Sequence, residues 1–178
     1  MYKLLSVILL TSSFAFSQEV KVKKYVLSNG LTVLLSENHD TPQIFGAVVV
    51  KAGGKNDPKE ATGIAHYLEH MLFKGTDDFG TFDYPKEKVY LDRIVAYYDT
   101  LGNTTDEAKR KTIQDSINEN SVRAGKYAIP NELDRMLKQI GSTGVNAFTT
   151  EDFTAYHNEF PSNQLERWLS IYSHRFEK

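Results

Sequence analysis

The chain has 178 residues, a length that fits one domain. Its 21 Lys and Arg residues face 23 Asp and Glu residues, so the net charge is −2, and nothing in this balance favours nucleic acid or an anionic lipid as a partner. Cysteine is absent, which excludes disulfides, thiol catalysis and cysteine-bound zinc or iron–sulfur clusters. Any metal must therefore be held by histidine and carboxylate side chains.

Residues 1–17 have the pattern of an export signal. A lysine precedes the apolar run Leu4–Leu10, and small residues at positions 15 and 17 precede a cleavage site before Gln18. The alternative is an N-terminal membrane anchor, but the apolar run is short for a span of about 20 residues, and Ser and Thr interrupt it. We therefore expect an exported protein, periplasmic or extracellular after cleavage, with no stable membrane span.

The first part of the mature chain predicts strands followed by one helix. Alternating apolar residues on either side of a Ser-Asn-Gly turn predict a hairpin over residues 20–36. Residues 44–50 predict a third strand, apolar enough to be covered on both faces. After a loop, Thr62 is the predicted N-cap of a helix over residues 63–73, and Gly75 ends that helix.

The second part is mainly helical. Residues 77–87 are rich in turn formers, and residues 88–126 are helical in character with a break near residues 102–105. The polar half of that stretch predicts a solvated helix. The remaining elements are expected, in order, as a helix over 132–140, strands over 145–150 and 153–157, and an amphipathic helix over 162–176. This order of strands and helices predicts an α+β domain.

The strongest local motif is His66-Tyr67-Leu68-Glu69-His70. Positions i, i+3 and i+4 of a helix share a face, so both imidazoles can bind one metal ion with a carboxylate beside it. Neutral imidazole suits zinc, which lowers the pKa of its bound water toward about 7, and Glu69 is then the predicted general base. The alternative is a surface helix that carries these side chains by accident, a match expected only about 0.01 times in a chain of this composition.

The residues around this motif, Gly63–Thr76, resemble the signature of the insulinase/pitrilysin (M16) zinc metallopeptidases, in which the order H-x-x-E-H inverts H-E-x-x-H. The hairpin around residues 27–33 is similar to the family's opening strands. Residues 144–156 resemble its second conserved block, and residues 162–176 resemble the helix that follows. Three ordered blocks are much more specific than one five-residue motif.

The resemblance implies an antiparallel sheet packed by helices. His66 and His70 match the family's zinc-binding histidines, and Glu69 matches its catalytic base. Asn146 and Ala147 match an edge strand near the zinc, where an extended peptide is expected to add as a further strand through backbone hydrogen bonds; a plain hairpin strand is the alternative for this pair. Complete members pair such units into a closable chamber. We therefore expect a peptide or unfolded polypeptide as substrate and a second M16-type domain or subunit as partner.

One part of the family pattern is missing. The third zinc ligand is a glutamate about fifty residues after the Asn-Ala strand, which places it beyond Lys178. The glutamates that follow Asn146 come too early, and His157 and His174 are more simply interpreted as surface residues of a strand and a helix. The expected organisation is a signal peptide followed by an incomplete M16 N-terminal domain over residues 18–178. This piece by itself is expected to be inactive, because a catalytic zinc has three protein ligands.

Residues 83–140 match the family least and predict a helical insertion on the surface; the alternative is an element that contacts a partner or substrate. For its tyrosines Tyr90, Tyr97, Tyr98 and Tyr127, packing is favoured over binding. The sequence thus predicts the N-terminal part of an exported zinc endopeptidase. Two other classes stay open: a non-catalytic M16-like subunit that binds a partner or peptide, and a simple two-histidine metal-binding helix.

Overall fold

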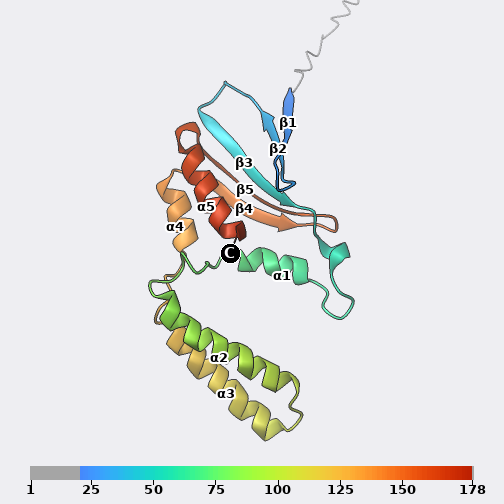
Figure 1. Cartoon of the computed structure of the whole chain (residues 1–178), viewed down its shortest axis with the longest axis vertical. Helices are drawn as coiled ribbons and strands as arrows, with labels where there is room; N and C mark the ends of the chain where they lie inside the picture. Colours follow the sequence, from blue (N-terminus) through green and yellow to red (C-terminus); the bar gives the residue numbers. More distant parts are fainter. Residues whose placement is uncertain (1–20, 178) are drawn as a thin grey trace, which may run out of the picture. The chain divides into compact units, whose positions relative to one another are not determined.

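The computed structural model of the chain describes residues 21–177 (Figure 1). The export signal predicted for residues 1–17 lies outside the described residues and stays a prediction. The chain divides into two compact units, one ending at Thr41 and one beginning at Pro42, and each is described by itself. Over residues 21–177, every helix is too short or too polar to cross a membrane.

The described part of the first unit is the predicted hairpin. Strand β1 (Val22–Val26) pairs antiparallel with β2 (Thr32–Ser36). Gly30 in the connecting turn has φ +86°, a conformation that glycine adopts without steric strain. Its N–H donates to the carbonyl of Leu27 at 2.9 Å. The hairpin is confirmed, and it begins slightly later than residue 20.

The second unit contains an antiparallel sheet in the order β3-β5-β4, built from β3 (Gln43–Val50), β4 (Thr143–Thr149) and β5 (Thr154–Pro161). Strand β4 is therefore an edge of this sheet within the described chain. Strand β5 runs past the predicted end at residue 157, because the polar residue Asn158 is fully buried and continues the inward alternation to Phe160. Together with the helices, this sheet confirms the predicted α+β class.

The helices of the second unit are α1 (Ile64–Met71), α2 (Tyr84–Gly102), α3 (Glu107–Ala124), α4 (Glu132–Gln139) and α5 (Leu165–Glu177), with 3₁₀ turns over Gly54–Asn56 and Ser162–Gln164. Helix α2 begins before the predicted residue 88. Pro85 was interpreted as a turn residue, but it lies in the first turn of the helix, where a missing N–H costs nothing, and Asp83 caps the helix by accepting from the Lys86 N–H at 3.2 Å.

The core of the second unit lies between α4, α5 and β5. Its buried apolar residues are Phe79, Leu133, Leu137, Ile140, Tyr156, Phe160, Trp168, Ile171 and Tyr172. The polar side chain of Asn158 lies among them: it accepts from Trp168 Nε1 and from the Tyr172 hydroxyl, both at 2.8 Å, and donates to Ser142 Oγ at 2.9 Å. The part of the predicted surface insertion that forms α4 is thus packed in the core rather than on the surface. Whether residues 83–140 are inserted relative to the family stays a prediction.

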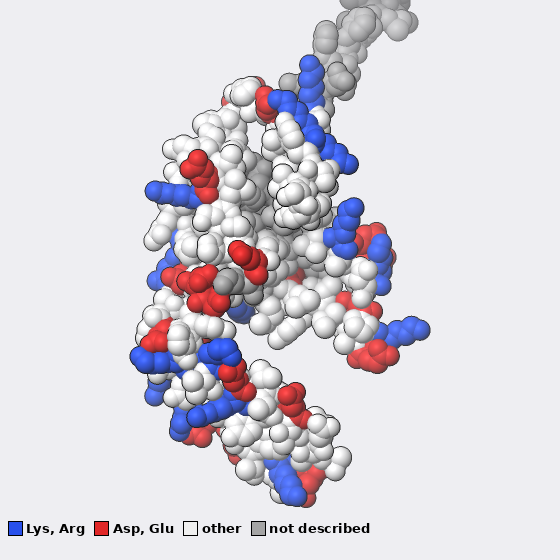
Figure 2. Space-filling view, viewed as in Figure 1, with Lys and Arg blue, Asp and Glu red and all other residues white. Residues whose placement is uncertain are grey.

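Helices α2 and α3 form an antiparallel pair. Arg110 Nη1 closes their turn by donating to the carbonyls of Leu101 at 2.9 Å and Thr104 at 2.7 Å. At the other end, the Tyr127 ring packs 5.5 Å from Phe82 and 6.2 Å from Tyr90, which supports packing for Tyr90 and Tyr127. Tyr98 is instead 54% exposed. Basic and acidic side chains are interspersed over this pair on the face drawn in Figure 2, as expected of solvated helices.

Candidate metal centre

The loop before α1 holds the start of the helix that carries the motif. Gly63, with φ +89°, is the N-cap of α1, and no side chain of the helix caps it. The Asp57 carboxylate accepts instead from the backbone N–H groups of Gly63 at 2.5 Å and Ala65 at 2.9 Å. A negative charge at this position also interacts favourably with the helix dipole. The prediction of Thr62 as N-cap was wrong, because a more distant carboxylate occupies the site.

The structure brings the two predicted ligands together. His66 and His70 lie one helical turn apart, both exposed, with their Nε2 atoms 3.1 Å from each other and their ring centroids 4.7 Å apart. A tetrahedral zinc about 2.0–2.1 Å from each nitrogen requires the nitrogens to be about 3.3 Å apart. The two imidazoles therefore fit a shared zinc ion with little adjustment.

Glu69 faces a different environment from the histidines. Its side chain is 6% exposed, and its Oε2 atom accepts from the Thr149 hydroxyl at 2.6 Å. Thr149 is the last residue of β4, so the carboxylate is attached to the edge strand. Helix α1 thus exposes the two imidazoles while it directs the predicted base toward the sheet.

The predicted substrate-contacting pair lies in the same strand. Asn146 is exposed and stands opposite His157 of β5, whereas Ala147 is half-buried and stands opposite Tyr156. The strand has a register shift between Thr143 and Asn146, which marks a β-bulge. These residues lie on the edge strand, as predicted, and their contact with substrate stays a prediction.

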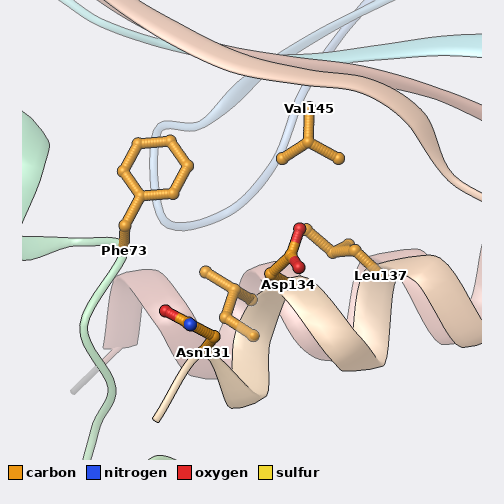
Figure 3. Close-up of a pocket in the computed structure, with 6 residues that line it drawn as sticks. Phe73, Asn131, Asp134, Leu137 and Val145 are labelled. Atoms are coloured by element: carbon orange, nitrogen blue, oxygen red, sulfur yellow. The ribbon is translucent and has the colours of Figure 1, made fainter.

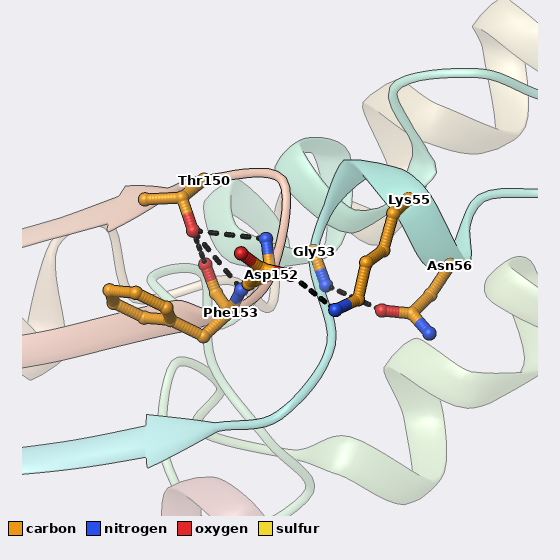
Figure 4. A network of polar contacts seen from close by, with 6 residues as sticks. All are labelled: Gly53, Lys55, Asn56, Thr150, Asp152 and Phe153. Carbon is orange, nitrogen blue, oxygen red and sulfur yellow. Dashed lines mark hydrogen bonds and ion pairs between the residues drawn. The ribbon is translucent and has the colours of Figure 1, made fainter.

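The turn between β4 and β5 is tied to the loop before α1 (Figure 4). The N–H groups of Gly54 and Lys55 donate to the carbonyls of Thr150 at 2.9 Å and Glu151 at 3.0 Å, and Lys55 forms an ion pair with Asp152. A Cβ atom at Gly53 would lie within 2.7 Å of three backbone atoms of this turn. Only glycine permits this approach, so the loop and the turn are in direct contact.

No third ligand joins the histidines among the described residues, where no group of three His, Asp or Glu side chains can hold a metal ion. His157 packs beside the rings of Phe45 at 5.5 Å and Phe148 at 6.0 Å. His174 contacts Asp78 at 3.2 Å. The third ligand expected beyond Lys178 stays a prediction.

Two residues near α1 were not identified from the sequence: Thr149 and Arg175. Arg175 is 1% exposed, and its Nε–H donates to the carbonyl of Leu72 at 2.7 Å, directly after α1. Its guanidinium lies 4.5 Å from the Phe73 ring and 4.6 Å from the Tyr156 ring. Burial lowers the pKa of Arg175, while the neighbouring tyrosines act in the opposite direction. The sequence did contain a sign that Arg175 is buried: it follows Tyr172 by three residues and so lies on the apolar side of the helix.

A hollow of about 250 Å³ lies between α4, β4 and the residues after α1. Figure 3 shows Phe73 and Val145 on one side of it and the side chains of α4 on the other. The residues that line it are Phe73, Asn131, Leu133, Asp134, Leu137 and Val145. The only charged side chain among them, Asp134, is paired with Lys138 at 2.7 Å. The hollow is therefore a mainly apolar feature next to the edge strand.

Comparison with known proteins relates part of the chain to a family. A sequence model described as insulinase (peptidase family M16) matches residues 32–87, which include the motif on α1. Over this stretch the chain is similar to the insulinase family, M16. Its relatives include an insulin-degrading enzyme homolog of Dictyostelium discoideum, 37% identical over 48% of this chain and 8% of the relative. They also include a putative zinc protease of Caenorhabditis elegans, 43% identical over 42% of this chain and 8% of the relative.

The fold agrees with this similarity. The crystal structure of pitrilysin is similar with a TM-score of 0.54 and 21% identity, over 90% of this chain and 12% of that chain. The chain spans less than a tenth of the length of these two relatives, at 8% of each. The predicted antiparallel sheet packed by helices is confirmed as the M16 fold.

Proposed function

We propose that this M16 chain is part of an exported zinc-dependent endopeptidase that hydrolyses peptide bonds in peptides or unfolded polypeptides. The observation that carries the proposal is the pair of imidazole nitrogens 3.1 Å apart on α1, next to a glutamate that contacts the edge strand. The naming of a relative as a putative zinc protease supports zinc as the metal. Export rests on the signal-like pattern of residues 1–17.

The roles of the residues follow from their positions. His66 and His70 hold the metal through their Nε2 atoms. When bound there, zinc supplies an acidic water molecule and polarises the carbonyl of the scissile peptide bond. Glu69 Oε1 or Oε2 accepts the proton from the attacking water and delivers it to the leaving amine, as a general base and then a general acid.

The substrate is proposed to bind along β4. An extended peptide that pairs with Asn146 and Ala147 is held by backbone hydrogen bonds, so that its side chains matter little to binding. This arrangement suits unfolded polypeptides of varied sequence. The third ligand, and a second M16-type domain or subunit that closes the chamber, are proposed to lie outside residues 21–177.

The test uses the full-length protein and a quenched-fluorescence peptide. We expect cleavage that a chelator abolishes and zinc restores, and we expect Glu69→Gln to keep its zinc while kcat falls by about 10²–10⁴-fold, the usual contribution of a general acid–base group. The matched control is Glu60→Gln, because Glu60 is an exposed residue of the loop before α1; this variant should behave as wild type. Cleavage that resists chelation, or an unaffected Glu69→Gln variant, would reject the proposal. Peptide binding without cleavage would favour a non-catalytic M16-like subunit.

A further inference from the structure

We propose that Thr149 is a positioning residue for Glu69, an inference that rests on the proposed function because it assigns the support of its base. Thr149 ends β4 and is half-buried. Its hydroxyl lies 2.6 Å from Glu69 Oε2 and 3.2 Å from the hydroxyl of Thr154. Glu69 is 6% exposed, so this hydroxyl supplies a hydrogen bond to a carboxylate that is largely shielded from water.

The hydrogen bonds around Thr149 have a definite direction. An ionised carboxylate and a backbone carbonyl can only accept, whereas each threonine hydroxyl has one proton to donate. Thr149 therefore donates its proton to Glu69. Thr154, which is 4% exposed, donates its proton to the carbonyl of Ala52 at 2.9 Å. The Glu69 carboxylate is thus bonded to Thr149, and the neighbouring Thr154 is bonded to the loop that precedes α1.

The hydrogen bond from Thr149 restricts the carboxylate of Glu69. A glutamate side chain has three rotatable bonds, and a general base acts only within hydrogen-bond reach of the proton that it accepts. A short hydrogen bond to an ionised oxygen is one of the stronger kinds in proteins. With Oε2 held by Thr149, the other oxygen, Oε1, keeps a fixed direction. Thr149 thereby sets the geometry of the base without touching the substrate.

The kinetic experiment compares variants of the full-length protein. Thr149→Val keeps the shape of the side chain and removes the hydroxyl; it is expected to lower kcat about tenfold or more, with KM within about twofold and zinc content unchanged. Thr149→Ser keeps the hydroxyl and is expected to retain kcat within about threefold. Thr112→Val, at an exposed position of α3 outside the proposed site, is the matched control and should equal wild type. If Thr149→Val does not fold, Thr149→Cys replaces it, because a thiol of similar size is a weak donor.

A structural experiment decides the inference even if the wild-type protein cleaves nothing and the proposed function fails. In crystal structures of the full-length wild type and Thr149→Val, we expect one Glu69 rotamer bonded to Thr149 in the first and a displaced or multiple rotamer in the second. An unchanged Glu69 rotamer in Thr149→Val would overturn the inference. So would a kcat equal to wild type in an active protein, or a loss of activity in Thr149→Ser as large as in Thr149→Val.

Discussion

Gly53→Ala is predicted to separate the loop before α1 from the turn after β4. The backbone of Gly53 is extended, with φ −148° and ψ −168°, so alanine introduces no backbone strain there. The added Cβ atom, however, would lie within 2.7 Å of Thr150 O, Glu151 O and Phe153 N. All three are backbone atoms, which cannot rotate away, so the loop and the turn must move apart.

The cost follows from the contacts that this movement breaks. The hydrogen bonds from the Gly54 N–H to Thr150 O at 2.9 Å and from the Lys55 N–H to Glu151 O at 3.0 Å are lost first. At about 0.5–1.5 kcal/mol each, their loss lowers the free energy of unfolding by about 1–3 kcal/mol. The ion pair between Lys55 and Asp152 is exposed and contributes little to this difference.

Gly54→Ala provides the matched control at the next residue. A Cβ atom at Gly54 would meet only Thr150 O, at an ordinary contact distance of 3.9 Å, and its φ is not positive. This variant is expected to be neutral or to stabilise by about 0.4–1 kcal/mol, because alanine restricts the unfolded chain. Thermal and urea unfolding of the two variants measure the difference. If Gly53→Ala is as stable as Gly54→Ala, the contact between loop and turn does not exist as described.

Two further predictions concern buried groups. Asn158→Leu leaves Trp168 Nε1 and the Tyr172 hydroxyl without their acceptor. At about 1–3 kcal/mol for each group, the free energy of unfolding measured in urea is expected to fall by about 2–6 kcal/mol. The control Asn163→Leu, at an exposed site, should lower it little. Burial raises the pKa of Tyr156, so the folded state favours its neutral phenol. The resulting stability is fully present below about pH 10 and is lost as the pH rises through the raised pKa. Tyr156→Phe is therefore expected to lose less stability than wild type between about pH 9 and 11. An equal loss in both proteins would contradict this.

Local patterns in the sequence predicted most of the elements. Alternating apolar residues around Ser28-Asn29-Gly30 predicted the first hairpin, and a periodic apolar stripe predicted α5. The spacing of His66 and His70 predicted that their rings meet, because residues four apart on a helix are always neighbours. These features depend on contacts within a few residues, which is the range that a sequence pattern reports.

Contacts between distant residues were not predicted. The i+3 spacing placed Glu69 beside the histidines, but its partner is Thr149, eighty residues away, and the helix pattern carries no signal for it. Asp57 replaced Thr62 at the start of α1 for the same reason: the loop folds back so that a carboxylate reaches two free N–H groups. Arg175 was not singled out from the sequence, and four aromatic rings surround its guanidinium at 4.5–5.8 Å.

The short loop between β3 and α1 connects the two halves of the candidate centre. At one end its glycines and Lys55 bind the turn after β4, and at the other end Asp57 binds the start of α1. The helix that carries the histidines and the strand that carries Thr149 are therefore fixed to the same segment of backbone. A change in this loop would alter the distance from Glu69 to Thr149 without removing any ligand. The loop thus holds the helix of His66 and His70 beside the strand of Thr149 through contacts at both of its ends.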